Sequence, residues 1–403
     1  EILSDKLQFV NTTRNKSMTV QLIALAGARL VLNTALRFVY PFSPALARGL
    51  GVSREDIYFL ITLRNLMGFL SPVFGPLSER YGRRAILMTG VAIFSLGSIL
   101  VVIWPTYWIL GISLCAIGIA KVLYDPAMQA YVGDEVPYAN RGTAIAITEY
   151  SWSLALLVGV PIVGLLMQQK SWQAPFFWFG VGGVVAIFVL WRSISTSSKK
   201  DSSTAPLAKI SQLLREHHVV LFAALYITLF ITANEMLLIV FGGWMEDVFN
   251  LSLTSLGVSA AIIGGAEFVG ETAAGWSVDR YGKRPVIITF GFITAFCNLL
   301  LPLTSTTLFG TLVTLFFLFL AFEITVVGGI PLMTELVPGS RAVVMSIILA
   351  AMFLGRSLGS FLGPFAWNIV GFSFAGIIWA AIIVVSMFIL IVWVREENQY
   401  NKY

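Results

Sequence analysis

The sequence has few charged residues and very few histidines and cysteines. Of its 403 residues, 12% are charged, whereas soluble globular proteins carry about 25%, so the chain cannot cover itself with a hydrated surface. Its two cysteines, Cys115 and Cys297, lie in hydrophobic runs. Without a paired-cysteine motif, a disulfide framework, a cysteine metal site and a redox site are excluded. The sequence also lacks a nucleotide-binding P-loop pattern and a cluster of metal ligands, so we expect no cofactor, no metal and no enzymatic activity.

Hydrophobic residues, by contrast, make up 57% of the sequence and recur in long runs along the whole chain. A helix needs about 20 apolar residues to cross the hydrocarbon core of a membrane, and twelve runs reach this length. We therefore expect an all-α membrane protein with twelve transmembrane helices in two pseudo-symmetric six-helix bundles. The expected spans are 18–41, 55–76, 85–104, 107–131, 142–166, 174–192, 218–242, 254–276, 285–302, 307–332, 342–366 and 371–394.

The net charge of +5 would suggest nucleic-acid binding in a soluble protein, but the positions of the basic residues explain it better. Eighteen of the 26 Lys and Arg residues fall in the two tails and in the loops on the side of the tails. The loops on the other side hold three, Arg48, Arg54 and Lys170. Because basic loops stay in the cytoplasm, we expect a multi-pass protein of the plasma (inner) membrane with both termini cytoplasmic and no nucleic-acid partner.

The longest hydrophilic interval inside the chain, 193–217, divides the expected spans into six and six. Its first part is rich in Ser, which is typical of a flexible linker. Its second part has apolar residues at helical spacing and is typical of a helix on the membrane surface. We expect an N-terminal bundle with its tail over 1–192, a cytoplasmic linker over 193–217 and a C-terminal bundle with its tail over 218–403.

The two halves repeat one another. Residues 75–84 read GPLSERYGRR and residues 275–284 read GWSVDRYGKR, an offset of 200 residues. Several matches at one offset indicate a duplication, and paired six-helix halves are how many secondary transporters build a central site that opens to either side. The other pairs at this offset are Glu135 and Glu335, Arg141 and Arg341, and Gly159 and Gly359.

The duplicated loop resembles the signature loop of the major facilitator superfamily, GxxxDRxGRR between the second and third spans, with Glu79 in place of the usual Asp. The resemblance covers the whole chain and implies a transporter that works by alternating access, without naming its substrate. It implies that Glu79 and Asp279 act as conformational latches facing a helix N-terminus, whereas the basic residues serve the same motion or only fix the topology. The matching residues are Gly75, Glu79, Arg80, Gly82, Arg83, Arg84, Gly275, Asp279, Arg280, Gly282, Lys283 and Arg284.

Small residues indicate close helix packing at several places. Gly75 and Gly82 permit close helix approach and a tight chain reversal. The run from Val158 to Gly164 in the fifth span partly resembles the Gly-Pro-rich motif of antiporter members of the family, and the eleventh span has glycines spaced by four. The resemblance implies an exporter, although close packing alone would also account for both stretches.

Eleven ionisable residues lie inside the expected spans, and each needs a reason because a charge near the bilayer centre costs about 2.5–3.5 kcal/mol. The first six spans hold four of the five bases, and the last six spans hold four of the six acids. The bases are Arg29, Arg37, Arg64, Lys121 and Arg356. The acids are Asp125, Glu149, Glu235, Glu267, Glu271 and Glu323.

The first span carries Arg29, Asn33 and Arg37 at a spacing of four, which places them in one polar stripe on a helix. Helices one, four, seven and ten line the central cavity in this family, so the resemblance implies that the stripe faces the substrate path. Arg64 lies near mid-depth in the second span. These arginines either bind substrate or only pair with the acids of the fourth and fifth spans.

Two further groups of charges are expected to form ion pairs. Lys121 and Asp125 lie one turn apart in the fourth span, where a local pair is the simplest interpretation. Drug/proton exporters carry an Arg earlier in this helix, at a position that is apolar here, so Lys121 cannot be given that role. Glu271 lies close to the second signature loop and is expected to pair with Arg280 or Arg284.

Glu235, which follows Asn234 in the seventh span, and Glu323 in the tenth resemble the helix-seven and helix-ten acids of quinolone-type multidrug/proton antiporters. A carboxyl in low-dielectric surroundings can take up and release protons near neutral pH. We therefore expect Glu235 and Glu323 to couple protons and Asn234 to bind substrate; the alternative is a structural pairing with Arg356. Because Arg356 cannot serve all four acids of its half, at least one carboxyl should lack a permanent ion-pair partner.

These features predict a secondary active transporter that exports a small organic molecule by proton-coupled antiport. The alternative is a transporter of anionic or amphipathic substrates, such as organic anions or lipids, in which buried arginines supply the counter-charge. The expected partners are a small-molecule substrate, protons and the lipid bilayer, and the family resemblance implies a monomer. The expected substrate-binding residues are Arg29, Asn33, Arg37, Arg64 and Asn234.

Overall fold

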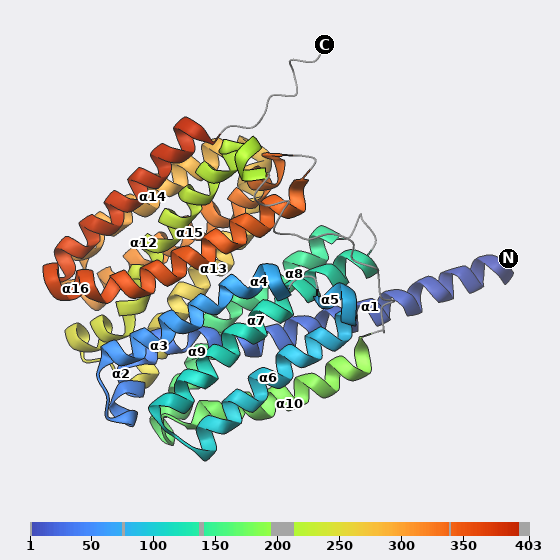
Figure 1. The fold of residues 1–403 in the computed structure, drawn as a ribbon, viewed down its shortest axis with the longest axis horizontal. Coiled ribbons are helices and arrows are strands. Elements are labelled where there is room, and N and C mark those ends of the chain that lie inside the picture. The colour runs from blue at the N-terminus through green and yellow to red at the C-terminus, as the bar shows by residue number, and fades with distance from the viewer. Residues whose placement is uncertain (1, 75–76, 137–140, 195–212, 338–339, 395–403) are drawn as a thin grey trace, which may run out of the picture.

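The computed structural model of the protein describes residues 2–74, 77–136, 141–194, 213–337 and 340–394 (Figure 1). Every regular element in these ranges is helical. Within them, 11 helices are long and apolar enough to cross a membrane. Together with one interrupted helix described below, they account for the twelve expected spans, and they confirm the predicted fold class.

The elements follow one another in chain order as helices joined by short connections. The first half of the chain contains α1 (Ile2–Arg37), α2 (Val39–Leu50), α3 (Arg54–Leu66), η1 (Met67–Leu70), α4 (Ser71–Phe74), α5 (Leu77–Tyr81), α6 (Arg83–Ile103), α7 (Tyr107–Glu135), α8 (Arg141–Leu154), η3 (Ala155–Gly159), α9 (Val160–Gln169) and α10 (Ala174–Ser193). The second half contains α12 (His218–Phe249), α13 (Leu253–Tyr281), α14 (Lys283–Thr304), α15 (Leu308–Glu335) and α16 (Arg341–Trp393).

The second expected span, 55–76, does not form one continuous α-helix. It is built from α3, the 3₁₀ turn η1 and α4, which follow one another directly. α3 begins with a capping box between Ser53 and Asp56, which satisfies two backbone N–H groups at its start. Pro72 has no N–H to donate to the carbonyl four residues earlier, which favours the tighter turn at η1.

The first expected span continues past its predicted end at residue 41, as α2, to Leu50. A turn at Phe38 separates α1 from α2, because Pro41 cannot donate a hydrogen bond to the carbonyl of Arg37. The proline therefore places a break between Arg37 and Tyr40, two residues of the site described below.

The last two expected spans are joined within α16. The chain reverses at Gly371, whose φ of 71° belongs to the left-handed region that glycine adopts most readily. The two spans are Val343–Phe372 and Phe374–Trp393, so the eleventh helix is longer than its predicted range of 342–366.

The duplicated loops have the same backbone conformation. Gly82 and Gly282 have φ angles of 91° and 84°, so both loops depend on a residue without a side chain at the same place. Arg84 and Arg284 each donate a hydrogen bond to a backbone carbonyl of the last helix in their own half, α10 and α16. The repeat in the sequence is therefore a repeat in structure.

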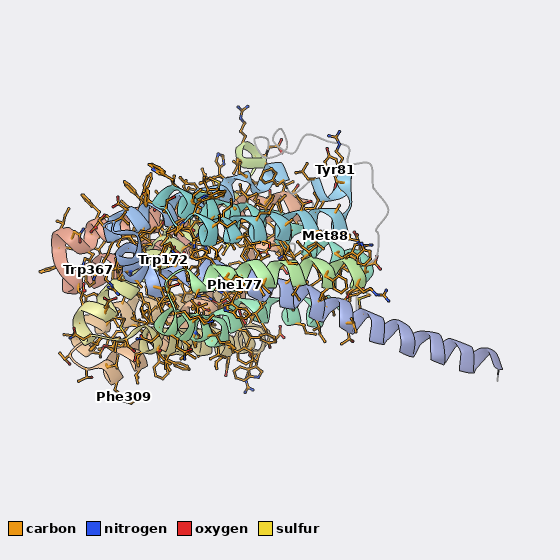
Figure 2. The ribbon with its side chains drawn as sticks, turned by 90° about the horizontal axis from the view of Figure 1, so that it is seen from below. Tyr81, Met88, Trp172, Phe177, Phe309 and Trp367 are labelled. Atoms are coloured by element: carbon orange, nitrogen blue, oxygen red, sulfur yellow. The ribbon has the colours of Figure 1, made fainter. Side chains whose placement is uncertain are left out.

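The two halves lie side by side, and α5 and α2 lie at opposite ends of the first half (Figure 1). We name these ends of the molecule the α5 end and the α2 end. Figure 2 shows the Tyr81 side chain at the α5 end, whereas Trp172 and Trp367 lie toward the α2 end. The predicted loops on the two sides of the membrane therefore separate in space as expected.

The halves are joined closely at the α2 end. Arg54 donates two hydrogen bonds of 2.6 and 2.7 Å to Asp247, and Arg48 forms an ion pair with Glu246. A Cβ added to Gly242 of α12 would lie 2.3 Å from a carbonyl oxygen of α2. The backbones of the two halves therefore touch here, a contact that only glycine permits.

Most of the predicted linker over 193–217 falls on residues 195–212, which lie outside the described residues; residues 213–216 are helical. We propose that 1–192 and 218–403 are the two bundles on either side of this linker. Along the chain, α1 to α10 precede this linker and α12 to α16 follow it.

Candidate substrate and proton site

The polar stripe of α1 is buried, and its first member is fully paired. Arg29, Asn33 and Arg37 are all less than 5% exposed. Arg29 donates to Asp125 at 3.0 and 3.4 Å, lies 3.0 Å from a carboxylate oxygen of Glu149 and donates to the carbonyl of Thr148 at 2.9 Å. For Arg29 the structure therefore shows the pairing with the fourth and fifth spans that was the alternative to substrate binding.

Lys121 joins α7 to the middle of the same stripe. Its ammonium group lies 2.8 Å from Asp125 and donates to the amide oxygen of Asn33 at 2.5 Å. The predicted local ion pair between Lys121 and Asp125 is confirmed. Asp125 therefore serves two bases, Arg29 and Lys121, and this group of charges is balanced within the first half.

Arg37 pairs across the two halves. Its guanidinium donates to both carboxylate oxygens of Glu267 in α13, at 2.5 and 2.6 Å, and one of the same nitrogens donates to the carbonyl of Trp152 at 3.1 Å. Both side chains are 2% exposed. Bidentate, charge-assisted bonds of this kind are among the strongest in proteins, so Arg37 and Glu267 hold α1 against α13.

Arg64 is buried without an ion pair to any described carboxylate. Its guanidinium donates to the carbonyl of Leu36, to the amide oxygen of Asn65 at 2.9 Å and to the Tyr40 hydroxyl at 2.8 Å. Three neutral acceptors therefore satisfy this cation. Arg29, Arg37 and Arg64 are thus all occupied by protein groups in this arrangement, so none of them favours the alternative of an anionic substrate bound at these arginines.

Glu235 of α12 lies on the other side of the Tyr40 hydroxyl. It accepts from Tyr40 at 2.5 Å and from the Asn65 amide at 3.3 Å, and it lies 3.5 Å from the guanidinium of Arg356. Glu235 is 1% exposed. The structure therefore shows the pairing with Arg356 that was the alternative for this acid, and Tyr40 links the carboxyl of one half to the Arg64 of the other.

Glu323 of α15 differs from Glu235. It is 6% exposed, and it forms no hydrogen bond or ion pair with any residue that the structure describes. The charges that act on it are two acids, Glu267 and Glu271, and two bases, Arg37 and Arg356. The prediction that at least one carboxyl of this half lacks a permanent partner is confirmed at Glu323.

Asn234 and Glu271 complete the polar groups of the second half. Asn234 is 8% exposed, and its amide oxygen has no hydrogen-bond partner among the described residues. Glu271 accepts a hydrogen bond of 2.8 Å from Ser153 of α8. The expected ion pair of Glu271 with Arg280 or Arg284 is wrong, because Glu271 points across to the first half instead of toward its own loop.

Trp152 of α8 is the residue that the sequence analysis missed. Its partly buried ring has three cations around it: the guanidinium carbon of Arg37 lies 4.2 Å from the ring centroid, that of Arg356 5.0 Å, and the Lys121 nitrogen 5.6 Å. Such distances allow cation–π attraction. The available signal was its place three residues after Glu149 on one helical face, together with the rule that a buried aromatic ring often accompanies buried cations.

The signature loops pair within their own halves. Arg83 lies 3.4 Å from Asp134 of α7, and Lys283 pairs with Glu335 of α15, one position past the counterpart of Asp134. Each pair joins a base of the loop to an acid of an adjacent helix. Glu79 is half-exposed, with Arg83 4.0 Å away.

The remaining loop residues are exposed or lie outside the description. Asp279 is exposed, Arg80 lies over the ring of Tyr81 at 5.3 Å, and Arg280 lies over that of Trp276 at 5.6 Å. The latch role of the loop acids stays a prediction. Gly75 lies outside the described residues. The close helix approach expected at Gly75 therefore stays a prediction, and its counterpart Gly275 has open space around it.

Comparison with known proteins agrees with this geometry. The family model described as Major Facilitator Superfamily matches residues 25–266 and 224–403. A Bacillus subtilis protein named as an uncharacterized MFS-type transporter, YwfA, is 27% identical over 395 residues, which cover 96% of this chain and 92% of that protein.

Solved structures with the same fold are also transporters. The bacterial homologue of the human lysosomal transporter Spinster, in an inward-facing and occupied conformation, superposes with a TM-score of 0.75 at 14% identity, covering 93% of this chain and 96% of that one. The xylose transporter XylE from E. coli, in an inward open conformation, has a TM-score of 0.75 at 16% identity, covering 95% and 98%. The chain belongs to the major facilitator superfamily and is an integral, multi-pass membrane transporter.

Proposed function

We propose that this transporter exports a small organic molecule in exchange for protons. The observation that carries the proposal is the carboxyl of Glu323, which is buried on a membrane-spanning helix and has no partner among the residues that the structure describes. An ionised carboxylate without a counter-ion is costly in such a place. The group is neutralised by a proton or by a positive group of a substrate, and because it cannot hold both at once, the two ligands exclude each other.

Glu235 has a different part in this proposal. Its carboxylate is already held by Tyr40, Asn65 and Arg356, so a proton there would compete with three existing partners. We assign the main proton site to Glu323 and a secondary one to Glu235. The buried groups Arg29, Asn33, Arg37, Arg64 and Asn234 form the polar wall of the substrate path, with the unpaired amide oxygen of Asn234 as an acceptor for substrate.

The membrane orientation follows from the charge bias. The signature loops and their bases lie at the α5 end, so we propose that this end faces the cytoplasm and that both termini lie there, in the plasma (inner) membrane. Closure of the halves at the α2 end supports a state that is accessible from the cytoplasm. Reporter fusions near Gly49 and Lys200 should label on opposite sides of the membrane; labelling on the same side would refute this topology.

Alternating access then requires the halves to separate at the α2 end and to close at the α5 end. In that motion Glu79 and Asp279 would act as latches of the closed α5 end. We expect Glu79→Ala and Asp279→Ala to lower the transport rate more than substrate affinity. An equal loss of both in purified protein would assign the two acids to folding or to the binding site instead.

Flux in proteoliposomes tests the proton coupling. The wild-type protein should concentrate at least one member of a panel of labelled organic cations, anions and neutral compounds when a pH gradient is imposed, while an internal pH dye reports proton movement. Glu323→Gln keeps the shape of the side chain and removes its titration, so it should retain only downhill movement. Glu216→Gln, which removes an exposed carboxyl before α12, is the control. Uphill transport by Glu323→Gln at the wild-type level would refute the assignment.

A further inference from the structure

Arg356 is the base with the fewest partners among those inside the spans. Its side chain is 20% exposed, compared with 5% for Arg29 and 2% for Arg37. It donates no side-chain hydrogen bond to the described residues, and its one carboxylate contact is at 3.5 Å to Glu235. A guanidinium has five N–H donors; Arg37 uses three of them, whereas Arg356 donates none to the described residues.

Three cations gather around the Trp152 ring, and each of them also contacts a carboxylate. Arg37 and Lys121 lie there with Arg356, and the three cations come from α1, α16 and α7. Arg37 uses three of its five N–H donors, on Glu267 and on the carbonyl of Trp152, and the Lys121 ammonium uses two of its three hydrogens, on Asn33 and Asp125. Arg356 donates to none of the described residues, so it has the most free donors of the three cations, and Lys121 retains one.

Glu235 does not depend on Arg356. One of its carboxylate oxygens accepts from both the Tyr40 hydroxyl and the Asn65 amide, while Arg356 approaches the other oxygen. If Arg356 turned away, Glu235 would keep both hydrogen bonds. The 3.5 Å contact is thus the weakest link in this group of charges and the one that a ligand can replace at the lowest cost.

We propose that Arg356 and Lys121, at the Trp152 ring, form a subsite for a carboxylate group of the transported molecule, and that this carboxylate displaces Glu235 from Arg356. The proposal rests on the proposed function, since it names a second group of that molecule beside the positive group that competes with the proton at Glu323. The planar fork of a guanidinium matches a carboxylate in two parallel hydrogen bonds. Because Glu235 stays in the site after it leaves Arg356, a carboxylate ligand adds one negative charge to the site, whereas a dianionic phosphate would add two.

Equilibrium binding to the purified protein in detergent tests this subsite with three probes of one shape: benzoate, benzamide and benzylammonium. Isothermal titration calorimetry should detect benzoate and neither of the others. Arg356→Gln should weaken benzoate binding by about tenfold or more, since a charge-assisted hydrogen bond is lost. Arg356→Lys, which keeps the charge without the fork, should lose part of the affinity. Glu235→Gln should tighten binding, because it removes the competing carboxylate.

Two further variants separate binding from folding. Lys170→Gln removes an exposed base in the loop before α10 and should leave the affinity unchanged. Arg356→Gln combined with Glu235→Gln removes both charges of the pair, so it should unfold at the wild-type temperature and still fail to bind benzoate.

Three results would overturn the subsite: no benzoate binding to the wild type, equal binding of benzoate and benzamide, or unchanged affinity in Arg356→Gln. No gradient is present in this experiment. If the protein binds benzoate through Arg356 but a pH gradient does not drive transport, the subsite is supported and the proton coupling is refuted. If a pH gradient drives transport but benzoate does not bind through Arg356, the proton coupling is supported and the subsite is refuted.

Discussion

The two halves of the protein share one ancestral plan but differ in their buried charges. The first half has four bases and two acids inside its expected spans, and the second has one base and four acids. Neither half has equal numbers of buried bases and acids. The bidentate pair of Arg37 with Glu267 joins a base of the first half, which has more bases, to an acid of the second half, which has more acids. Duplication therefore supplied the scaffold, and later divergence of charge supplied an attraction between the copies.

The same comparison explains why two arginines at one ring behave differently. Arg37 and Arg356 both lie over Trp152, from opposite halves. Arg37 holds both oxygens of a carboxylate of the other half, whereas Arg356 shares Glu235 of its own half with partners from the first half. One arginine is therefore suited to hold the halves together and the other to exchange partners.

Breaking the cross-half pair should give the largest effect. Arg37→Met and Glu267→Leu each leave one buried charge without a partner, and each should lower the free energy of unfolding by about 3–5 kcal/mol. The double variant removes both charges and should recover most of that loss. Thermal and denaturant unfolding in detergent measure these values. A double variant as unstable as either single one would show that packing, not charge, unites the halves here.

Much of the fold could be predicted from the sequence, because membrane spans are set by local hydrophobic length. The duplicated loops were also readable, since Gly82 and Gly282 must be glycine at positive φ. The break after Arg37 and the interruption at η1 were missed. Both come from prolines inside apolar runs, where hydropathy alone does not show which carbonyl loses its donor.

The site was less predictable, because its contacts join residues far apart in the chain. Pairing within one helix, as between Lys121 and Asp125, follows from spacing. Pairing of Arg37 with Glu267 depends on how α1 faces α13, which no local pattern encodes. Glu271 was therefore predicted wrongly. The sequence favoured a base close to it in the chain, Arg280 or Arg284, whereas in the structure Glu271 contacts the Ser153 hydroxyl of the first half.

The backbone contact at the α2 end offers the next test of how the halves meet. Gly242→Ala places a methyl group against a carbonyl oxygen of α2 and should destabilise the closed arrangement of the halves by about 1–3 kcal/mol. Closure can be followed by disulfide formation between Arg48→Cys and Glu246→Cys in a background with both native cysteines replaced. The crosslink yield should fall in Gly242→Ala. Gly275→Ala, at a position with open space, is the control, and an equal fall there would remove the steric explanation.

Removing the Tyr40 hydroxyl, which links Arg64 to Glu235, should lower stability less than breaking the Arg37–Glu267 pair or substituting Gly242. Tyr40→Phe deletes the hydroxyl that accepts from Arg64 and donates to Glu235, so unfolding should require about 1–2 kcal/mol less. Tyr226→Phe is the matched control, because the buried Tyr226 hydroxyl has no hydrogen-bond partner among the described residues. The argument from hydrogen bonding would fail if both variants lost the same stability.

The exposed pairs at the α2 end should matter least, and salt distinguishes them from the buried pair. Arg54 and Asp247 are 34% and 50% exposed, whereas Arg37 and Glu267 are each 2% exposed. An exposed pair contributes about 0.2–1 kcal/mol and is screened by ions. Arg54→Gln should therefore lower the crosslink yield at the α2 end slightly at roughly 0.05 M salt and have no effect at roughly 1 M. The loss in Arg37→Met should be the same at both concentrations, because bulk ions do not reach the buried carboxylate that it leaves behind. If the two variants were equally sensitive to salt, water and ions would already reach Arg37 between the halves. The attraction between the basic first half and the acidic second half would then be screened by salt like that of an exposed ion pair.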